Sequence, residues 1–258
     1  MLLVEIISVI FLRWKSVHSS VKMRLIKQNI KLPIVEVKLG GSYGENDNFQ
    51  RHGKLLPSNI RAIFCGPSNT GKTTALLSLI YNLEGVKFNN LYIFSKTLYQ
   101  AKYKELSAVM RSLPDVGYYT FSDCEAVPSP DDVRPNSLMI FDDVATEMGK
   151  NKHLRAYFSM GRHKNIDTFL LLQTFSSAPK QLCRDNANMI LLFRQDALNL
   201  KHVWNDHVIG DMSFEKFCNL CNLAWNRKEY GCLVICKDFD LNNGRYRIGF
   251  DTYINLEQ

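Results

Sequence analysis

The stretch that decides the fold is Gly66-Pro67-Ser68-Asn69-Thr70-Gly71-Lys72-Thr73-Thr74, which completes the pattern G-x-x-x-x-G-K-[ST]. The apolar run Arg61–Cys65 precedes it, and the helix-like run Ala75–Ile80 follows it. A phosphate chain needs several inward-pointing backbone N–H groups, and glycine allows the close approach and positive φ that such a loop requires. A helix that begins directly after the loop adds its unpaired amides and its dipole. This order of strand, loop and helix predicts a nucleotide-binding site rather than an ordinary glycine-containing turn.

The side chains of this loop have distinct predicted roles. Lys72 is expected to reach the β- and γ-phosphates of ATP, and the hydroxyl of Thr73 is expected to bind Mg²⁺. The full set expected to contact the nucleotide is Gly66, Pro67, Ser68, Asn69, Thr70, Gly71, Lys72, Thr73 and Thr74.

Two carboxylates follow another apolar run. Asp142 and Asp143 come directly after Leu138–Phe141, and the carboxyl end of a parallel strand is the edge at which ligands bind. One carboxylate there can hold Mg²⁺ through water, and a second can orient the water that attacks the γ-phosphate. We therefore assign Asp142 to the metal and Asp143 to the water. The alternative is a helix N-cap, which the upstream phosphate loop makes the weaker choice.

From Arg61 onward, short apolar runs alternate with amphipathic runs, a pattern typical of a parallel sheet flanked by helices. The predicted strands are Arg61–Cys65, Leu91–Phe94, Tyr118–Phe121, Leu138–Phe141, Thr168–Leu172 and Met189–Phe193. The predicted helices are Thr73–Leu83, Tyr99–Leu113, Leu154–Met160 and Pro179–Asp185. Near the C-terminus we expect a hairpin formed by Cys232–Lys237 and Tyr246–Phe250.

The spacing of these strands bears on the class of nucleotide-binding protein. In the additional-strand group of P-loop NTPases, a further strand lies between the loop strand and the acidic strand, and it ends in a polar residue that senses the γ-phosphate. The apolar run Thr168–Leu172 suits that strand, and Gln173, which closes it, is the natural sensor. The alternative for Gln173 is a surface residue that merely ends a strand. The predicted fold class is α/β, a RecA-like additional-strand P-loop NTPase with a mainly parallel central sheet flanked by helices.

The composition fits one domain with a short extension. The chain has 258 residues, of which 46% are hydrophobic, enough for one sizeable core. We expect a basic, partly flexible extension over residues 1–56 and an ATPase domain over residues 57–258. The 32 Lys and Arg residues outnumber the 25 Asp and Glu residues, and the formal charge of +7 favours polyanionic partners. The apolar start Met1–Leu12 is too short to span a bilayer, so no membrane partner is expected; Met23 is an alternative start.

The seven cysteines are scattered and odd in number, which favours a reducing compartment over a disulfide framework. Cys218 and Cys221, followed by Cys232 and Cys236, leave zinc open as an alternative. Burial is favoured, because the first pair follows a helical apolar spacing and the second pair would lie about 13 Å apart in a strand.

Two further stretches of sequence restrict the choice of protein family. Gly161-Arg162-His163-Lys164-Asn165-Ile166 leads into the strand that ends at Gln173, and Met189-Ile190-Leu191-Leu192-Phe193-Arg194-Gln195 follows. With the phosphate loop and Leu138–Asp143, this set resembles the FtsK–HerA superfamily, specifically the poxvirus-type genome-packaging ATPases of large DNA viruses, virophages and Polinton-like elements. The resemblance covers about residues 57–250, and Arg162–Gln173 is its most restrictive part. One departure is Asp143, where many members carry Glu.

The resemblance implies an oligomeric ring motor that hydrolyses ATP and pumps double-stranded DNA into a capsid. It implies that Arg162 projects into the active site of the neighbouring subunit, with Arg155 as the competing candidate. The alternative for either arginine is a solvated or DNA-facing cation. Such a motor works inside the host cell, in a virus factory or the nucleus, and meets the capsid or portal protein transiently. Lys180 and Arg184, which follow Gln173, are candidates for DNA contacts in the ring channel, with a solvated surface as the equal alternative.

Two other functions stay open from the residues alone. The first is a DNA translocase or helicase of the same superfamily that does not package a genome. The second is a relic that binds nucleotide without turnover. The intact set of Lys72, Thr73, Asp142, Asp143 and Gln173 argues against the relic.

Overall fold

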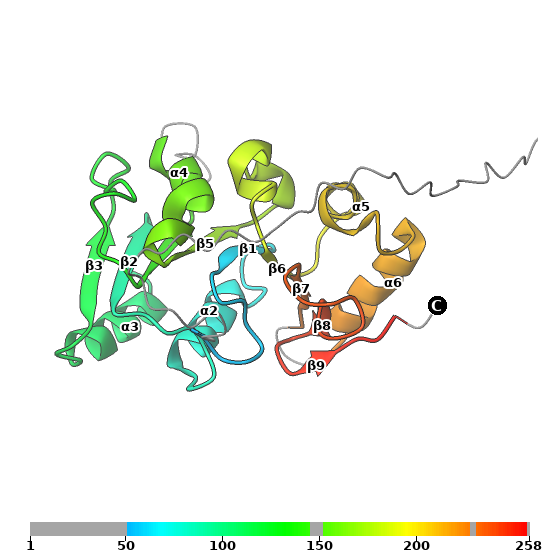
Figure 1. Ribbon diagram of the computed structural model, residues 1–258, viewed down its shortest axis with the longest axis horizontal. Helices are drawn as coiled ribbons and strands as arrows, with labels where there is room; N and C mark the ends of the chain where they lie inside the picture. Colours follow the sequence, from blue (N-terminus) through cyan, green and yellow to red (C-terminus); the bar gives the residue numbers. More distant parts are fainter. Residues whose placement is uncertain (1–50, 145–151, 228–230, 257–258) are drawn as a thin grey trace, which may run out of the picture. The chain divides into compact units, whose positions relative to one another are not determined.

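The fold is organised by one nine-stranded sheet with the strand order β3-β2-β4-β5-β1-β6-β7-β8-β9 (Figure 1). The computed structural model describes residues 51–144, 152–227 and 231–256. Six strands are parallel: β1 (Arg61–Cys65), β2 (Asn90–Ser95), β3 (Gly117–Phe121), β4 (Ser137–Asp142), β5 (Ile166–Leu172) and β6 (Met189–Leu192). Three strands extend the sheet in antiparallel fashion: β7 (Leu233–Cys236), β8 (Tyr246–Ile248) and β9 (Thr252–Tyr253).

Strand β5 lies between β4 and β1, as the sequence predicted for the additional strand. Its register sets Leu171 opposite Asp142 and Leu172 opposite Cys65. The residues that follow these three strands therefore emerge side by side at one edge of the sheet. This α/β architecture, with a mainly parallel sheet, confirms the predicted fold class.

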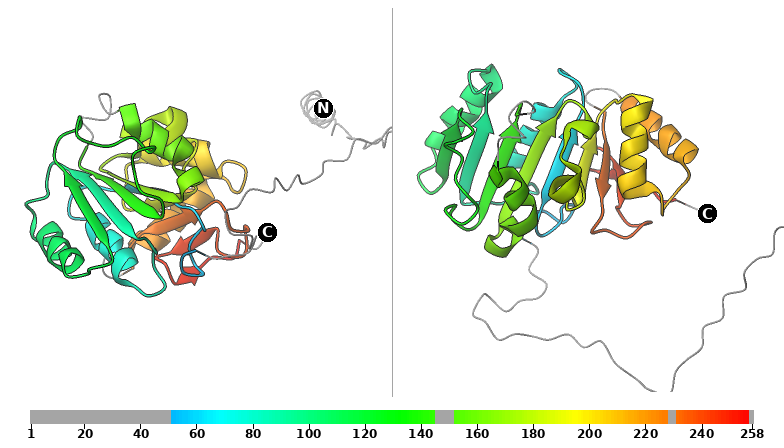
Figure 2. Two further views of the ribbon diagram at one scale, coloured as in Figure 1. Left: turned by 60° about the vertical axis from the view of Figure 1, so that its left-hand side comes forward. Right: turned by 90° about the horizontal axis from the view of Figure 1, so that it is seen from above.

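Helices cover both faces of the sheet (Figures 1 and 2). Helices α2 (Lys72–Tyr81) and α3 (Ala101–Arg111) pack on one face. Helices α4 (Lys152–Met160), α5 (Ala197–Val203) and α6 (Phe214–Trp225) contribute to the core on the other. Strand β1 shows why its run is continuously apolar: Ala62 and Phe64 face the first layer, and Ile63 and Cys65 face the second. Strands buried on both faces lose the polar alternation of a half-exposed strand.

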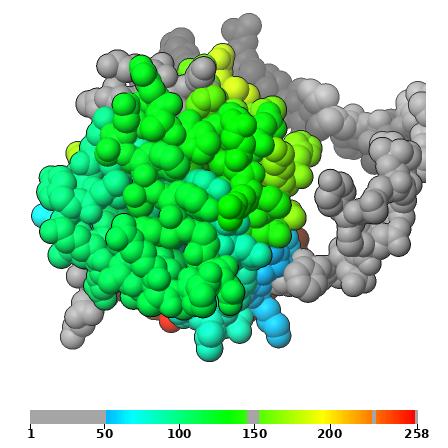
Figure 3. All heavy atoms as spheres, turned by 90° about the vertical axis from the view of Figure 1, so that its left-hand side faces the viewer, coloured from blue at the N-terminus to red at the C-terminus, as the bar shows by residue number. Residues whose placement is uncertain are grey.

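The two ends of the sheet differ. Strand β3, at one end, is only partly buried, and in Figure 3 the green segments around it form the surface that faces the viewer. At the other end, the predicted C-terminal hairpin is present as β7 and β8. Among the described residues, no helix is long and apolar enough to cross a bilayer.

One predicted helix is wrong. Pro179–Asp185 forms only a single wide turn, Lys180–Arg184, in which Gln181 and Leu182 leave the helical region and Leu182 has φ 70°. The segment bends because Cys183 is fully buried while Arg184 pairs with a distant aspartate, Asp206. Long-range contacts here override the local helical pattern. Helix α5 was not predicted, although Asp196, which caps it by accepting the N–H of Asn199, is a recognisable N-cap.

A buried carboxylate anchors the residues just before the first strand. Asp167, in β5, lies 3.0 Å from the guanidinium of Arg51 and 3.1 Å from Nε2 of His52, and it accepts the N–H of Ile60 at 2.7 Å. Nδ1 of His52 accepts the N–H of Lys87 at 3.0 Å, so the ring proton belongs on Nε2, facing the carboxylate. Burial lowers the pKa of Arg51, and Asp167 opposes that shift.

These contacts bear on the predicted domain boundary. The chain divides into Met1–Asn46 and Asp47–Gln258, and the predictions made for residues 1–50, including the apolar start, lie outside the described residues. Within the described part, Arg51 and His52 already belong to the sheet domain through Asp167. The boundary at residue 57 stays a prediction.

We expect Asp167→Asn to lower the free energy of unfolding by about 3–5 kcal/mol, because it leaves a little-exposed guanidinium without its counter-charge. Urea denaturation at pH 7 measures the change. The control is Asp131→Asn, which removes an exposed pair with Lys164 at 3.3 Å and should cost about 0–1 kcal/mol. Equal losses in the two variants would contradict this role for Asp167.

Candidate functional site

The phosphate loop connects β1 to α2 through two left-handed residues. Asn69 has φ 62° and Gly71 has φ 105°, conformations that asparagine tolerates and glycine adopts freely. Gly66 is needed for a different reason, since a Cβ there would lie 2.5 Å from Cβ of Phe193. Close approach and positive φ, the two reasons expected for glycine here, thus act at separate positions.

Helix α2 begins at Lys72 with no side chain capping its first amides. Those amides and the helix dipole form a positive end beside the loop. Nζ of Lys72 donates to the carbonyl oxygens of Gly66 at 2.5 Å and Pro67 at 2.8 Å, which holds the ammonium over the loop. Burial lowers the pKa of Lys72, and the nearby carboxylates of Asp142 and Asp143 oppose that shift.

The two carboxylates at the end of β4 have different environments. Asp142 is buried, and its Oδ2 accepts a hydrogen bond from the hydroxyl of Tyr103 in α3. Burial raises the pKa of Asp142, and Asp143 adds to that rise, whereas Tyr103 and Lys72 lower it. Asp143 is exposed and has a left-handed φ of 54°. Backbone conformations of this kind in residues other than glycine are concentrated at functional sites.

Gln173 follows β5 and exposes its side chain at the same edge. Its carbonyl oxygen accepts a hydrogen bond from Nε2 of Gln195 at 3.0 Å. The N–H of Gly66 in turn donates to the carbonyl of Leu172 at 3.0 Å. Loop strand and sensor strand are therefore joined by backbone hydrogen bonds right up to the site.

One open cleft of about 580 Å³ gathers most of the predicted residues. It is lined by Ser68, Asn69, Gly71, Lys72, Thr73, Asp142, Asp143 and Gln173 from the predicted set. It is also lined by residues that the sequence analysis did not select, including Thr97, Gln100 and Lys102 around the start of α3. The hydroxyl of Thr73 and the carboxylate of Asp142 are oxygen donors, which suit Mg²⁺; such sites use one or two protein ligands and leave the rest to phosphates and water.

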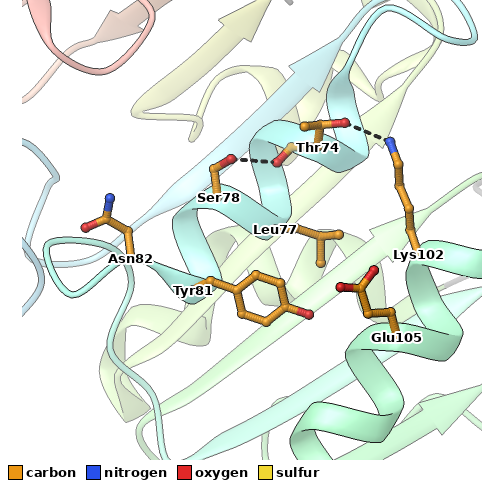
Figure 4. A pocket seen from close by; sticks show the side chains of 7 residues that line it. All are labelled: Thr74, Leu77, Ser78, Tyr81, Asn82, Lys102 and Glu105. Carbon is orange, nitrogen blue, oxygen red and sulfur yellow. Dashed lines mark hydrogen bonds between the residues drawn. The ribbon is translucent and has the colours of Figure 1, made fainter.

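Thr74 lies outside this cleft and opens onto a neighbouring groove between α2 and α3 (Figure 4). Nζ of Lys102 donates to its Oγ1 at 2.7 Å, and its carbonyl accepts from Ser78 at 2.9 Å. Lys102 lines both the groove and the cleft. Of the other predicted loop residues, Gly66, Pro67 and Thr70 do not line the cleft.

The two candidate arginines are exposed, and neither lines the cleft. Arg162 lies in the short 3₁₀ helix Gly161–Lys164, just before β5 begins, whereas Gln173 follows the end of β5. A strand of this length separates its ends by about 20 Å. Arg162 is therefore at the edge of the sheet opposite its own cleft. Arg155 lies in α4.

Arg184 is paired with a carboxylate within the fold. Its guanidinium lies 2.9 Å from Oδ2 of Asp206, with both side chains little exposed, and 5.3 Å from the ring centre of Phe175. Arg184 therefore has a structural role in the fold, and its assignment as a DNA contact stays a prediction. Lys180, in the same turn, is exposed.

The zinc alternative is wrong for the four cysteines considered. Cys221, in α6, packs into the core on one face of the sheet, with Cys218 beside that core, while Cys232 and Cys236 pack into the core on the other face. The sheet lies between the pairs, so the four thiols have no common position for an ion. Burial raises the pKa of Cys232 and of Cys236 to about 12, which keeps both as thiols.

Comparison with known proteins gives the family. The family described as Poxvirus A32 protein matches residues 122–255, just over half of the chain. The match includes Asp142, Arg162 and Gln173 and begins after the phosphate loop, so it is a separate observation from the loop motif.

Relatives in poxviruses carry a packaging name. The chain is 30% identical over 136 residues to DNA packaging protein OPG160 of Vaccinia virus (strain Copenhagen), covering 48% of this chain and 50% of the relative. It is 28% identical over 160 residues to OPG160 of Monkeypox virus, covering 58% and 52%. The chain thus spans about half the length of these relatives.

A solved structure has the same fold. The genome packaging NTPase B204 from Sulfolobus turreted icosahedral virus 2, in complex with sulfate, matches with a TM-score of 0.51 at 12% identity, over 79% of this chain and all of B204. Likeness at this identity concerns the fold alone. With the family match, it confirms the resemblance inferred from the sequence: the chain belongs to the Poxvirus A32 protein family.

Proposed function

We propose that this protein is an ATP-hydrolysing motor subunit that moves double-stranded DNA, with the packaging of a viral genome as its task. The observation that carries the proposal is the single cleft lined by Lys72, Thr73, Asp142, Asp143 and Gln173. Phosphoryl transfer requires mainly positioning and charge stabilisation. This set supplies one ammonium group, a hydroxyl and a carboxylate that suit a metal ion, a second carboxylate that is exposed, and an amide. The family match and the names of the poxvirus relatives and of B204 support the packaging task.

In this proposal each residue has one role. The ammonium of Lys72 and the amides at the start of α2 bind the β- and γ-phosphates. Thr73 and Asp142 would hold Mg²⁺, which would neutralise phosphate charge. Asp143 orients the attacking water in line with the γ-phosphate, and the amide of Gln173 contacts that phosphate. Because Asp143 is exposed in the cleft and Asp142 is buried, the first suits water and the second suits the metal.

Arg162 has a role only if subunits associate. It lies at the edge of the sheet opposite its own cleft, so any cleft that it enters belongs to a neighbouring subunit. A catalytic role for Arg162 therefore requires associated subunits, and the proposal includes a ring of identical subunits with sites at their interfaces. Double-stranded DNA, capsid or portal protein, and a location inside the host cell complete the proposal, and the exposed Lys180 is a candidate DNA contact.

We expect wild-type protein to hydrolyse ATP faster when double-stranded DNA is present. We expect Lys72→Ala to abolish both rates, because it removes the ammonium that lies over the phosphate loop, whereas the ammonium of Lys102 is bound to Thr74. Turnover with and without DNA, alongside the oligomer mass, measures this. Lys104→Ala, an exposed change on α3, is the control and should keep the wild-type rate. If the assembled wild-type ring shows no DNA-stimulated ATP turnover, the proposal is wrong.

We expect Arg162→Ala to lower kcat by about 10³-fold, as for other trans-acting arginines, with nucleotide affinity unchanged. Arg155→Ala should lower kcat by less than about tenfold. Mixing Arg162→Ala with Lys72→Ala subunits should restore part of the activity, because an intact Arg162 can then enter a cleft with an intact Lys72. If mixing restores no activity and Arg155→Ala is the inactive variant, Arg155 is the arginine that enters the neighbouring active site.

We expect Tyr103→Phe to raise the Mg²⁺ concentration needed for half-maximal ATP turnover by about 10–100-fold, the usual effect of removing a hydrogen bond that orients a metal-binding carboxylate. The matched control is Tyr157→Phe, which removes a hydroxyl that donates to the carbonyl of Pro128 at 2.9 Å, away from the cleft. An identical Mg²⁺ requirement in the two variants would show that Tyr103 does not act through Asp142.

A further inference from the structure

Two buried side-chain amides hold the segment that follows the sensor strand. Nε2 of Gln195 donates to the carbonyl of Gln173 at 3.0 Å, and Oδ1 of Asn199 accepts the N–H of Ser176 at 3.0 Å. Gln195 lies in the connection between β6 and α5, and Asn199 lies in the first turn of α5. We refer to Gln195 and Asn199 together as the amide clamp.

The amide of Gln195 can bind in one orientation only. Its NH₂ group faces two acceptors, the carbonyl of Gln173 and the carbonyl of Arg194 at 3.1 Å, and a side-chain oxygen in that place would meet only other oxygens. Its own Oε1 is buried and has no hydrogen-bond partner among the described residues. A buried acceptor without a partner destabilises the fold. The side-chain hydrogen bonds that Gln195 makes with the described residues therefore all run through its NH₂ group.

The second amide is itself fixed. The N–H of Asn199 donates to Oδ1 of Asp196 at 2.9 Å, and its Nδ2 donates to Oδ2 of Asp196 at 2.6 Å. These two bonds leave Oδ1 of Asn199 pointing at Ser176. The cap of helix α5 thus serves also as a support for the segment after β5.

The same connection touches the phosphate loop. The N–H of Phe193 donates to the carbonyl of Cys65 at 2.8 Å, and its Cβ occupies the space that a side chain at Gly66 would need. Residues 193–199 therefore contact both the start of the phosphate loop and the segment from Gln173 to Ser176. These contacts hold the phosphate loop and the segment after β5 in a fixed position relative to each other.

We propose that Gln195, supported by Asn199, is a positioning residue that sets the place of the Gln173 side chain in the cleft. The inference rests on the proposed function, in which Gln173 contacts the γ-phosphate. The side chain of Gln173 is exposed, so its position depends on the backbone that carries it. Displacement of the reacting geometry by a fraction of an ångström to an ångström is enough to slow an enzyme.

The test is Gln195→Met, which keeps the length of the side chain and removes both the bond to Gln173 and the unpaired Oε1. We expect kcat to fall about tenfold, the value of one hydrogen bond realised in the transition state. ATP affinity should stay within about twofold, and Tm should shift by no more than about 4 °C, because a favourable and an unfavourable contact are removed together. Asn199→Ala provides a second variant and should lower kcat in the same direction.

A double-mutant cycle separates this role from a structural one. In the Gln173→Ala background, Gln195→Met should change kcat by less than about twofold, because both changes remove the same contribution. The matched control is Asn188→Ala, which removes another buried amide. Asn188 lies just before β6, at the other edge of the sheet, and binds the N–H of Arg61 at 2.8 Å and the carbonyl of Asn59 at 2.8 Å. It should lower Tm and leave kcat within about twofold.

The outcomes are distinct. If Lys72→Ala abolishes turnover but Gln195→Met keeps the wild-type kcat, or lowers it equally in the Gln173→Ala background, the clamp is wrong and the proposed function stands. If the assembled wild-type protein does not hydrolyse ATP, both fall. A loss of kcat confined to the background with an intact Gln173 supports the clamp.

Discussion

The register of β5 against its two neighbours is the constraint on which the site depends. Leu171 pairs with Asp142 and Leu172 pairs with Cys65, so the loop strand, the acidic strand and the sensor strand end at the same height. A slip of one residue would turn the apolar side chains of β5 to the opposite faces, and because both faces are packed, the core resists such a slip. The sequence of β5 thus fixes the geometry of a cleft to which the strand itself contributes only its last residues.

The sequence predicted the parts of this fold that are locally encoded. Continuous apolar runs marked the parallel strands, because burial on both faces leaves no polar alternation, and Asp142, Asp143 and Gln173 could be found from their position directly after such runs. Tyr103 and Gln195 could not be found in this way. Tyr103 lies 39 residues from Asp142 and Gln195 lies 22 residues from Gln173, and both read as ordinary members of a helix and a loop. Their partners are set by the packing of the sheet, which no local pattern records.

The net charge of the chain can be counted from the sequence, but the structure shows which cations are paired within the fold. The formal charge of +7 correctly describes the chain as basic, but several cations are committed inside the fold. Arg51 pairs with Asp167, Arg184 with Asp206 and Arg245 with Asp211. Their charges are balanced by carboxylates within the domain. A basic composition therefore identifies a class of partner and leaves the choice of contacting residues to the structure.

Strand β5 has one more consequence for the proposed ring. Arg162 precedes it and Gln173 follows it. Every residue of the strand is buried, and residues 168–171 are paired with strands on both sides. A strand held in this way does not open locally, so it behaves as a stiff rod. In a ring, each rod would join the γ-phosphate contact of one subunit to the arginine that enters the next. The nucleotide state of one subunit would then affect the neighbouring subunit on one side only. The subunits of the ring would therefore hydrolyse ATP in sequence.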